Sequence, residues 1–190
     1  KEQLDLRLVD HGDVRTPAKA GYDLEISEHE PGSFELGADE RDAVTVTPVT
    51  DTETGTQPVG EVGDKLLFAD PREQADTLVM PTATGVETFH QLRSKESPDS
   101  IDFNLDLPAG AQLIERGPGV AIMRGEKTLL QAAPPWSVDS AGKQVPTRFV
   151  VADGKLSLEI AHRDVDYQYP ILTDPEWHVS LDFGVAGNGL

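Results

Sequence analysis

The chain has 190 residues, of which 37% are hydrophobic, and its formal net charge is −18. A chain with this much negative charge repels nucleic-acid phosphates and anionic membrane surfaces. We therefore expect neither nucleic acid as a partner nor membrane insertion. The chain has no cysteine, which excludes disulfides and thiol chemistry. The 17 glycines and 14 prolines suit short strands joined by turns better than long helices.

Short apolar alternations separated by turn residues fill the first 80 residues. Leu4, Leu6 and Leu8 alternate with polar residues, as in a half-buried strand. Further strands are expected at 22–26, 44–49, 66–68 and 77–80. Residues 50–63 are rich in Thr, Gly, Pro and acid and predict a flexible loop. A single helical turn is expected within 69–76.

The alternation is clearer from Pro81 onward. In residues 101–107, four apolar side chains alternate with Asp102, Asn104 and Asp106, which predicts a strand with one face in a core and one acidic face in water. Other strands are expected at 86–92, from 113, and at 120–122 and 128–130, the last two as a hairpin.

Residues 145–181 carry the clearest local signal. Two alternating runs, 145–151 and 156–160, flank Asp153-Gly154, a pair that tolerates the positive φ of a tight hairpin turn. Tyr167, Tyr169 and Ile171 predict a third strand, which Asp174-Pro175 ends.

About a dozen short strands at roughly 8–12-residue spacing predict an all-β fold, namely one or two antiparallel β-sandwiches with short strands and long loops. A change of composition near Pro81 divides the chain into a β-rich part with long loops, 1–80, and a β-sandwich module, 81–182, followed by a linker, 183–190. Whether these parts form one sandwich or two stays open. Because the sequence starts at Lys1 without Met, we expect a piece of a longer protein.

Residues 169–175 read Tyr-Pro-Ile-Leu-Thr-Asp-Pro. They resemble the YP-[VI]-x-x-DP signature that closes a β-rich module upstream of RHS/YD-repeat or LamG-like regions in large exported actinobacterial proteins. The phrases at 85–87, 91–98, 107–110 and 135–142 are similar to the same module. The resemblance implies a secreted or cell-surface, non-catalytic unit whose partners are neighbouring domains of the same long chain, and it brings no catalytic residues.

The same phrases predict structural roles. Pro170 cannot donate a ladder hydrogen bond, so it should lie where a strand leaves its partner. Asp174, which precedes Pro175, is expected to be extended and to cap backbone N–H groups. Arg93 is expected to be half-buried and paired with Asp139 or Asp174. The residues with predicted structural roles are Arg93, Trp136, Asp139, Tyr169, Pro170, Asp174 and Pro175.

A group of carboxylates and imidazoles near the end of the chain offers oxygen and nitrogen ligands for Ca²⁺ or a transition metal. Its members are His162, Asp164, Asp166, Asp174 and Glu176, with His178 beside them. The alternative is a solvated turn followed by strand-surface residues, because neither an EF-hand nor an HExxH helix is present. The cofactor prediction is therefore none, with calcium as the one alternative.

No catalytic motif stands out. The chain lacks a GxSxG elbow, a P-loop and GxGxxG, and no pair of carboxylates is singled out for glycoside hydrolysis. Asp10-His11-Gly12-Asp13 fits a turn at least as well as a catalytic base. We therefore predict that the protein is not an enzyme.

Three hypotheses remain. The leading one is a structural or interaction module of a large secreted or cell-surface bacterial protein. The alternative is a carbohydrate- or calcium-dependent adhesion module that contacts a glycan or a surface protein, and a hydrolase is the least favoured. Aromatic rings that could stack on sugars are Tyr22, Trp136, Tyr167, Tyr169 and Trp177. A Trp that follows Pro134-Pro135 more often fills a core.

Overall fold

The computed structural model describes residues 3–50, 60–61 and 63–180. These residues form strands and turns but no helix, which confirms the all-β prediction. None of the described residues therefore lies in a helix that could span a membrane. Most of the loop predicted at 50–63, and the whole linker predicted at 183–190, lie outside the described residues.

The strands are β1 (Asp5–Asp10), β2 (Val14–Lys19), β3 (Asp23–Ser27), β4 (Phe34–Gly37), β5 (Val44–Pro48), β6 (Gly60–Glu61), β7 (Leu66–Arg72), β8 (Ala75–Pro81), β9 (Gly85–Leu92), β10 (Ser100–Asp106), β11 (Ala111–Arg116), β12 (Gly119–Arg124), β13 (Lys127–Ala132), β14 (Trp136–Val138), β15 (Thr147–Ala152), β16 (Lys155–Ile160), β17 (Ile171–Asp174) and β18 (Glu176–Val179).

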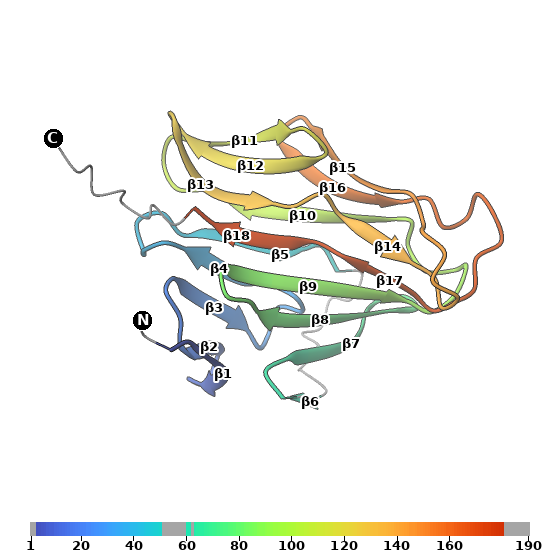
Figure 1. The fold of residues 1–190 in the computed structure, drawn as a ribbon, viewed down its shortest axis with the longest axis horizontal. Coiled ribbons are helices and arrows are strands. Elements are labelled where there is room, and N and C mark those ends of the chain that lie inside the picture. The colour runs from blue at the N-terminus through green and yellow to red at the C-terminus, as the bar shows by residue number, and fades with distance from the viewer. Residues whose placement is uncertain (1–2, 51–59, 62, 181–190) are drawn as a thin grey trace, which may run out of the picture.

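The strands pair antiparallel in two sheets that pack face to face (Figure 1). Sheet A has the order β1-β2-β3-β4-β5-β10-β16-β15. Sheet B has the order β11-β12-β13-β18-β9-β8-β7-β6, and β17 joins it by pairing with both β9 and β14.

Strands from both sides of Pro81 share each sheet. In sheet A, β5 pairs with β10, and in sheet B, β8 pairs with β9 through the hairpin at which the sequence predicted a boundary. Buried side chains from both parts also belong to a single hydrophobic cluster. The described residues on the two sides of Pro81 are therefore interleaved in one sandwich.

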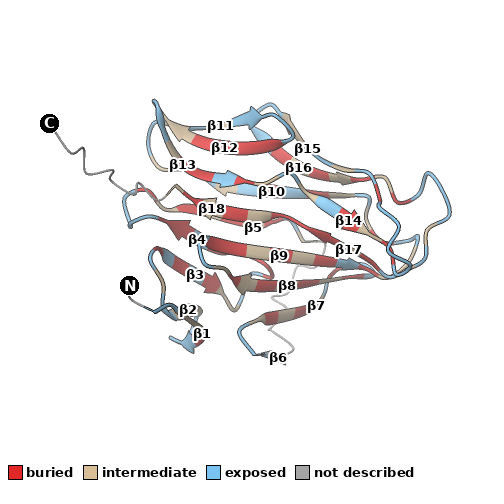
Figure 2. Ribbon diagram, viewed as in Figure 1, coloured by how far each residue is buried: buried red, intermediate tan, exposed pale blue. Residues whose placement is uncertain are grey.

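Trp177 of β18 is the centre of the core. It is fully buried in sheet B, and its ring lies 6.1, 6.4 and 6.3 Å from the rings of Phe34, Phe103 and Phe149, all of sheet A. Buried and less buried positions alternate along most strands (Figure 2). The period-two pattern of the sequence thus reflects which side chains face the opposite sheet.

The hairpin predicted around Asp153-Gly154 is confirmed. β15 and β16 pair from Thr147↔Ile160 to Ala152↔Lys155. Asp153 and Gly154 have φ values of 51° and 74°, as a two-residue hairpin turn of the primed type requires.

Two local predictions were wrong. The helical turn expected in 69–76 is instead the end of β7, a turn at 73–74 and the start of β8, with a register shift between Phe68 and Arg72. Tyr167 and Tyr169 are not in a strand: β17 begins only at Ile171. The tyrosines pack against the edge of the core, and their apolar character produced the apparent alternation.

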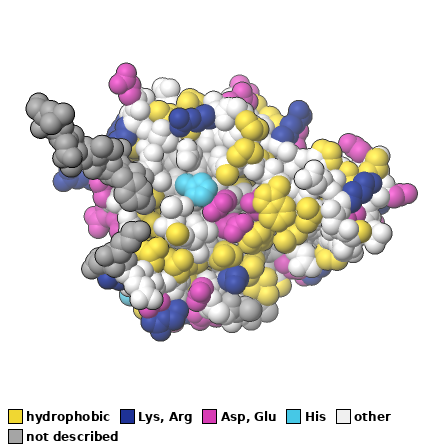
Figure 3. Space-filling view, viewed as in Figure 1, with side chains coloured by type: hydrophobic (Ala, Val, Ile, Leu, Met, Phe, Trp, Pro, Cys, Tyr) yellow, Lys and Arg dark blue, Asp and Glu magenta, His cyan; other side chains and the backbone are white. Residues whose placement is uncertain are grey.

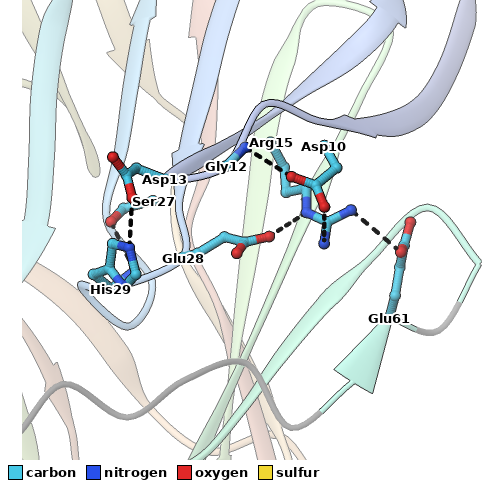
Figure 4. A network of polar contacts seen from close by, with 8 residues as sticks. All are labelled: Asp10, Gly12, Asp13, Arg15, Ser27, Glu28, His29 and Glu61. Atoms are coloured by element: carbon cyan, nitrogen blue, oxygen red, sulfur yellow. Dashed lines mark hydrogen bonds and ion pairs between the residues drawn. The ribbon is translucent and has the colours of Figure 1, made fainter.

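Ion pairs tie the sheets together at their sides. Arg15 of β2 contacts Asp10 at 3.2 Å and Glu61 of β6 at 3.6 Å, and it also pairs with Glu28, so it links the edge of sheet A to β6 of sheet B (Figure 4). The Asp10-His11-Gly12-Asp13 segment is the turn between β1 and β2, and the N–H of Gly12 donates to Asp10.

A buried carboxylate makes a second link. Asp42, which precedes β5, is only 3% exposed and pairs with Arg124 and Lys127 of the β12–β13 hairpin. The hydrogen bond from Lys127 is the largest cause of the lowered pKa of Asp42. Sheets A and B are therefore held in a fixed relation by charge as well as by the core.

Candidate interaction surface

An apolar row crosses the outer, solvent-facing side of sheet B. Leu67 of β7 lies opposite Leu78 of β8, which lies opposite Phe89 of β9. The ring of Trp136 of β14 stands edge-on to that of Phe89, with centroids 6.2 Å apart and an interplanar angle of 65°. We call Leu67, Leu78, Phe89 and Trp136 the apolar row. The first three are half-buried by their neighbours, and Trp136 is 42% exposed.

One hollow lies on this row, and a second one adjoins the row only at Trp136. The smaller, of about 220 Å³, is lined by Leu67, Asp76, Leu78, Phe89, Gln91 and Leu172. The larger, of about 710 Å³, is lined by Pro135, Trp136, Ser137, Val138, Gln144, Val145, Pro146 and Thr147. In the space-filling view, hydrophobic side chains gather on this side of the molecule beside acidic side chains and a histidine (Figure 3).

The backbone of Trp136 is held on both sides. Its N–H donates to Oδ1 of Asp174 at 3.0 Å, and its carbonyl accepts from the Thr173 hydroxyl at 3.3 Å. β14 is also paired with β17 from Trp136↔Asp174 to Val138↔Leu172. The interpretation of Trp136 as a core residue is thus not what the structure shows: Trp177 fills the core and Trp136 faces outward. The sequence motif Pro-Pro-Trp could not distinguish these outcomes, because the register of β14 decides which face Trp136 occupies.

Carboxylates border the apolar row on β9, β17 and β18. Glu87 lies directly opposite Glu176, and both are half-buried, whereas Asp174 is only 4% exposed. We call Glu87, Asp174 and Glu176 the acidic margin. Nε2 of His178 lies 3.5 Å from Glu176, and Nδ1 of the same ring contacts the hydroxyl of Thr84 at 2.9 Å.

Burial is the largest cause of the raised pKa values of Asp174 and Glu87. It raises the pKa of Asp174 to about 6. It also raises the pKa of Glu87, and the charges of Glu176 and Asp174 add to that rise. Like charges directly opposite on neighbouring strands oppose sheet pairing, so this arrangement costs stability.

The structure places the predicted metal ligands in separate surroundings. His162 is buried, and its Nδ1 lies 2.7 Å from the Tyr169 hydroxyl. Asp164 is exposed, and Asp166 pairs with Lys95 at 2.9 Å. Asp174 and Glu176 belong to the acidic margin. Among the residues that the structure describes, no group of three or more His, Asp or Glu side chains is arranged to hold a metal ion.

The residues with predicted structural roles have defined contacts. Asp139 is buried and accepts N–H groups of Ala141 at 3.0 Å, Lys143 at 2.8 Å and Gln168 at 2.9 Å. These backbone hydrogen bonds lower the pKa of Asp139, and the bond from Gln168 has the largest effect. Asp139 thereby fixes the 139–143 turn and ties it to the segment before the cis Tyr169–Pro170 peptide bond.

Arg93 is half-buried, as expected, but the predicted partners were wrong. It pairs with Asp70 and, at 3.4 Å, with Asp76, and not with Asp139 or Asp174. The reason is its position just after β9, where its N–H donates to the carbonyl of Gln74 in the β7–β8 turn. Its guanidinium therefore meets the acids of that hairpin.

Sequence reasoning missed Leu67, Leu78, Phe89 and Glu87 as surface residues. One signal was present: Leu78, Val79 and Met80 form an unbroken apolar run, which a strand with one solvated face does not need. The alternation of buried and half-buried positions in β8 shows that Leu78 and Met80 point away from the core.

The described fold and surface define an all-β sandwich with an apolar row on the outer face of sheet B. No protein-family model matches the chain, and neither a curated protein nor a solved structure matches it.

Proposed function

We propose that the protein is a non-catalytic interaction module, in which a rigid β-sandwich presents the outer face of sheet B to another molecular surface. The observation that carries this proposal is the apolar row. Its four large apolar side chains form a continuous line on the outer face of sheet B, where contact with the opposite sheet does not require apolar residues. Contiguous apolar patches on soluble proteins typically mark binding surfaces.

The setting that we propose is a secreted or cell-surface bacterial protein of several domains. Its support is the resemblance of residues 169–175 to the signature described above. In that setting, the partner of sheet B is a neighbouring domain of the same chain or another surface protein.

The two tryptophans provide the test. Because Trp177 is fully buried and Trp136 is 42% exposed, the emission of the native protein minus that of Trp136→Phe reports on the apolar row alone. We expect this difference signal to shift to the blue on titration with at least one of two ligand classes, amphipathic peptides or soluble oligosaccharides. Ile114→Ala, a change at another exposed apolar residue, should leave the response intact. A difference signal that neither class alters would contradict the proposal.

A carbohydrate-binding module is the second candidate. Its specific support is the pairing of exposed Trp136 with Phe89, since aromatic rings stack on sugar rings and nearby Gln91 and Glu87 offer hydrogen-bonding groups. A glycan array probed with native protein and with Trp136→Ala separates the two candidates: a signal that the substitution abolishes supports the second.

A further inference from the structure

We propose that the outer face of sheet B binds a polypeptide segment whose apolar side chains are bordered by Lys or Arg. This inference rests on the proposed function and names the chemistry of the partner. Two features carry it: the shape of the apolar row and the three carboxylates of the acidic margin beside it.

The apolar row fits side chains better than sugar rings. Half of its members, Leu67 and Leu78, are branched aliphatic residues, which offer no flat platform for stacking. The hollow of about 220 Å³ between them and Phe89 is smaller than the roughly 300–1,000 Å³ of a typical small-molecule site. An apolar side chain that projects from a docked segment would fill such a hollow and bury its lining.

The row crosses neighbouring strands, so its length follows from sheet geometry. Adjacent strands lie about 4.8 Å apart, and Leu67, Leu78 and Phe89 occupy three successive strands. With Trp136 beyond Phe89, the row accommodates several apolar side chains of one extended or helical segment. Backbone pairing of β14 with β17 keeps Trp136 in place, so little ordering is required on docking.

Carboxylates outnumber cations on the strands that form this face, and Arg93, just after β9, pairs with Asp70 and Asp76 beside the smaller hollow. Apart from the buried Arg72, none of β7, β8, β9, β14, β17 and β18 contains Lys or Arg. The acidic margin lies along one side of the row, and Asp76, which Arg93 contacts at 3.4 Å, lines the smaller hollow. A docked segment would remove water from these carboxylates, and a cation opposite them would offset that cost.

The pKa values are consistent with this complementarity. Burial already makes the charged forms of Asp174 and Glu87 unfavourable, as their raised pKa values show. Of the groups that face the margin, His178 is the only basic one that the described contacts place there. A Lys or Arg of the partner would stabilise the charged carboxylates, so binding should weaken as pH falls below about 6.

A second copy of this chain is a poorer occupant. Each copy carries a formal net charge of −18, and a symmetric contact through this face would bring two acidic margins close together. A basic segment, in contrast, is attracted at long range by the same charge.

The experiment uses three synthetic 12-residue peptides. The first alternates Leu with Lys, the second replaces Lys with Glu, and the third replaces Leu with Ser. Each is titrated into the protein at physiological salt, and the Trp136 difference signal is recorded together with calorimetry. We expect the Leu/Lys peptide to bind at least about tenfold more tightly than either control, because it alone has both complementary features.

Protein variants locate the contact. Phe89→Ala with Trp136→Ala should abolish binding as measured by calorimetry, and Glu87→Gln with Glu176→Gln should weaken it several-fold. Leu67→Ser, near the edge of sheet B, is a second test of the row if the double variant folds poorly. Asp106→Asn, on the outer side of sheet A, is the matched control and should bind as the native protein does.

Each outcome decides the matter. If the Leu/Glu peptide binds as tightly as the Leu/Lys peptide, the face does not select for cations and the inference is wrong. If the Ser/Lys peptide binds as tightly, binding reflects only attraction between opposite charges, and the inference is wrong as well. Binding of oligosaccharides instead of peptides, or self-association in sedimentation, overturns the inference while the proposed function stands. A Trp136 signal that no ligand alters overturns the proposed function as well.

Discussion

The two outer faces of the sandwich differ although both sheets have the same kind of inner face. On sheet A, the outward positions of the central strands are polar: Glu25, Glu35, Thr45, Thr47, Asp102, Asn104, Ser157 and Glu159. On sheet B, the outward positions of β7, β8 and β9 include Leu67, Leu78 and Phe89, and Trp136 of β14 lies against Phe89. Folding requires apolar residues only on the inner faces, because those alone contact the opposite sheet. The packing of the two sheets against each other therefore does not explain the difference between their outer faces.

Acidic residues show the same contrast. Glu25 and Glu35 are directly opposite on sheet A, and both are exposed to water. Glu87 and Glu176 are directly opposite on sheet B, but both are half-buried beside apolar side chains. Water screens the first pair, whereas the second pair repels in a less polar environment. Sheet B thus holds an arrangement that stability alone does not favour.

The two tryptophans give the prediction with the largest effect. Trp177→Ala removes the fully buried ring that contacts three phenylalanines of sheet A, so the free energy of unfolding should fall by about 3–5 kcal/mol. Trp136→Ala removes a ring that is 42% exposed and should cost less than about 1.5 kcal/mol. Urea denaturation followed by circular dichroism measures both values.

Equal losses for the two substitutions would contradict this distinction, since Trp136 would then belong to the structural core. A matched control is Ile114→Ala, because Ile114 is 40% exposed on the edge strand β11. Its effect should resemble that of Trp136→Ala.

The sequence predicts those features of this structure that depend on residues close together in the chain. Strict alternation at 101–107 and the Asp153-Gly154 turn predict β10 and the β15–β16 hairpin correctly, because both are local signals. The order of strands in the sheets is not local. Nothing in the residues of β5 indicates that β10 will lie beside it. The composition change at Pro81 therefore could not predict that strands from both sides of it share each sheet.

The candidate surface was harder to predict for the same reason. Trp136 was noticed, but its exposure depends on pairing with β17, and its contact with Phe89 joins residues far apart in the sequence. The partners of Arg93 were also missed, because the β7–β8 turn brings Asp70 and Asp76 to it. Side-chain types were visible in the sequence, whereas their neighbours depended on the register of distant strands.

Titration of Asp174 gives the prediction of intermediate size. Its pKa rises from 3.8 to about 6 on folding, so the folded chain holds this proton more tightly than the unfolded chain. Its contribution to stability is therefore greatest at low pH and is lost as pH rises from about 4 to about 6. Asp174→Asn removes the titration and keeps an oxygen that can accept the Trp136 N–H.

The measurement is the free energy of unfolding of both proteins from pH 4 to pH 7. The advantage of Asp174→Asn over the native protein should grow by about 2 kcal/mol between pH 4 and 6 and level off near pH 7. Carboxylates whose pKa is lowered, such as Asp42 and Asp139, produce slopes of the opposite sign in both proteins, and these cancel in the difference. A difference independent of pH would show that Asp174 is not desolvated in solution.

The smallest effect compares the two like-charged pairs. Glu87→Gln removes one charge from the half-buried pair with Glu176, so it should raise the free energy of unfolding by about 0.2–1 kcal/mol at pH 7. Glu25→Gln removes a charge from the exposed pair with Glu35 and should change stability by less, because water and salt already screen that repulsion. Denaturant titrations at low and high salt measure both differences. If Glu25→Gln stabilises the protein as much as Glu87→Gln, the two faces do not differ electrostatically, and the acidic margin loses its standing as a feature kept for contact with a cationic partner.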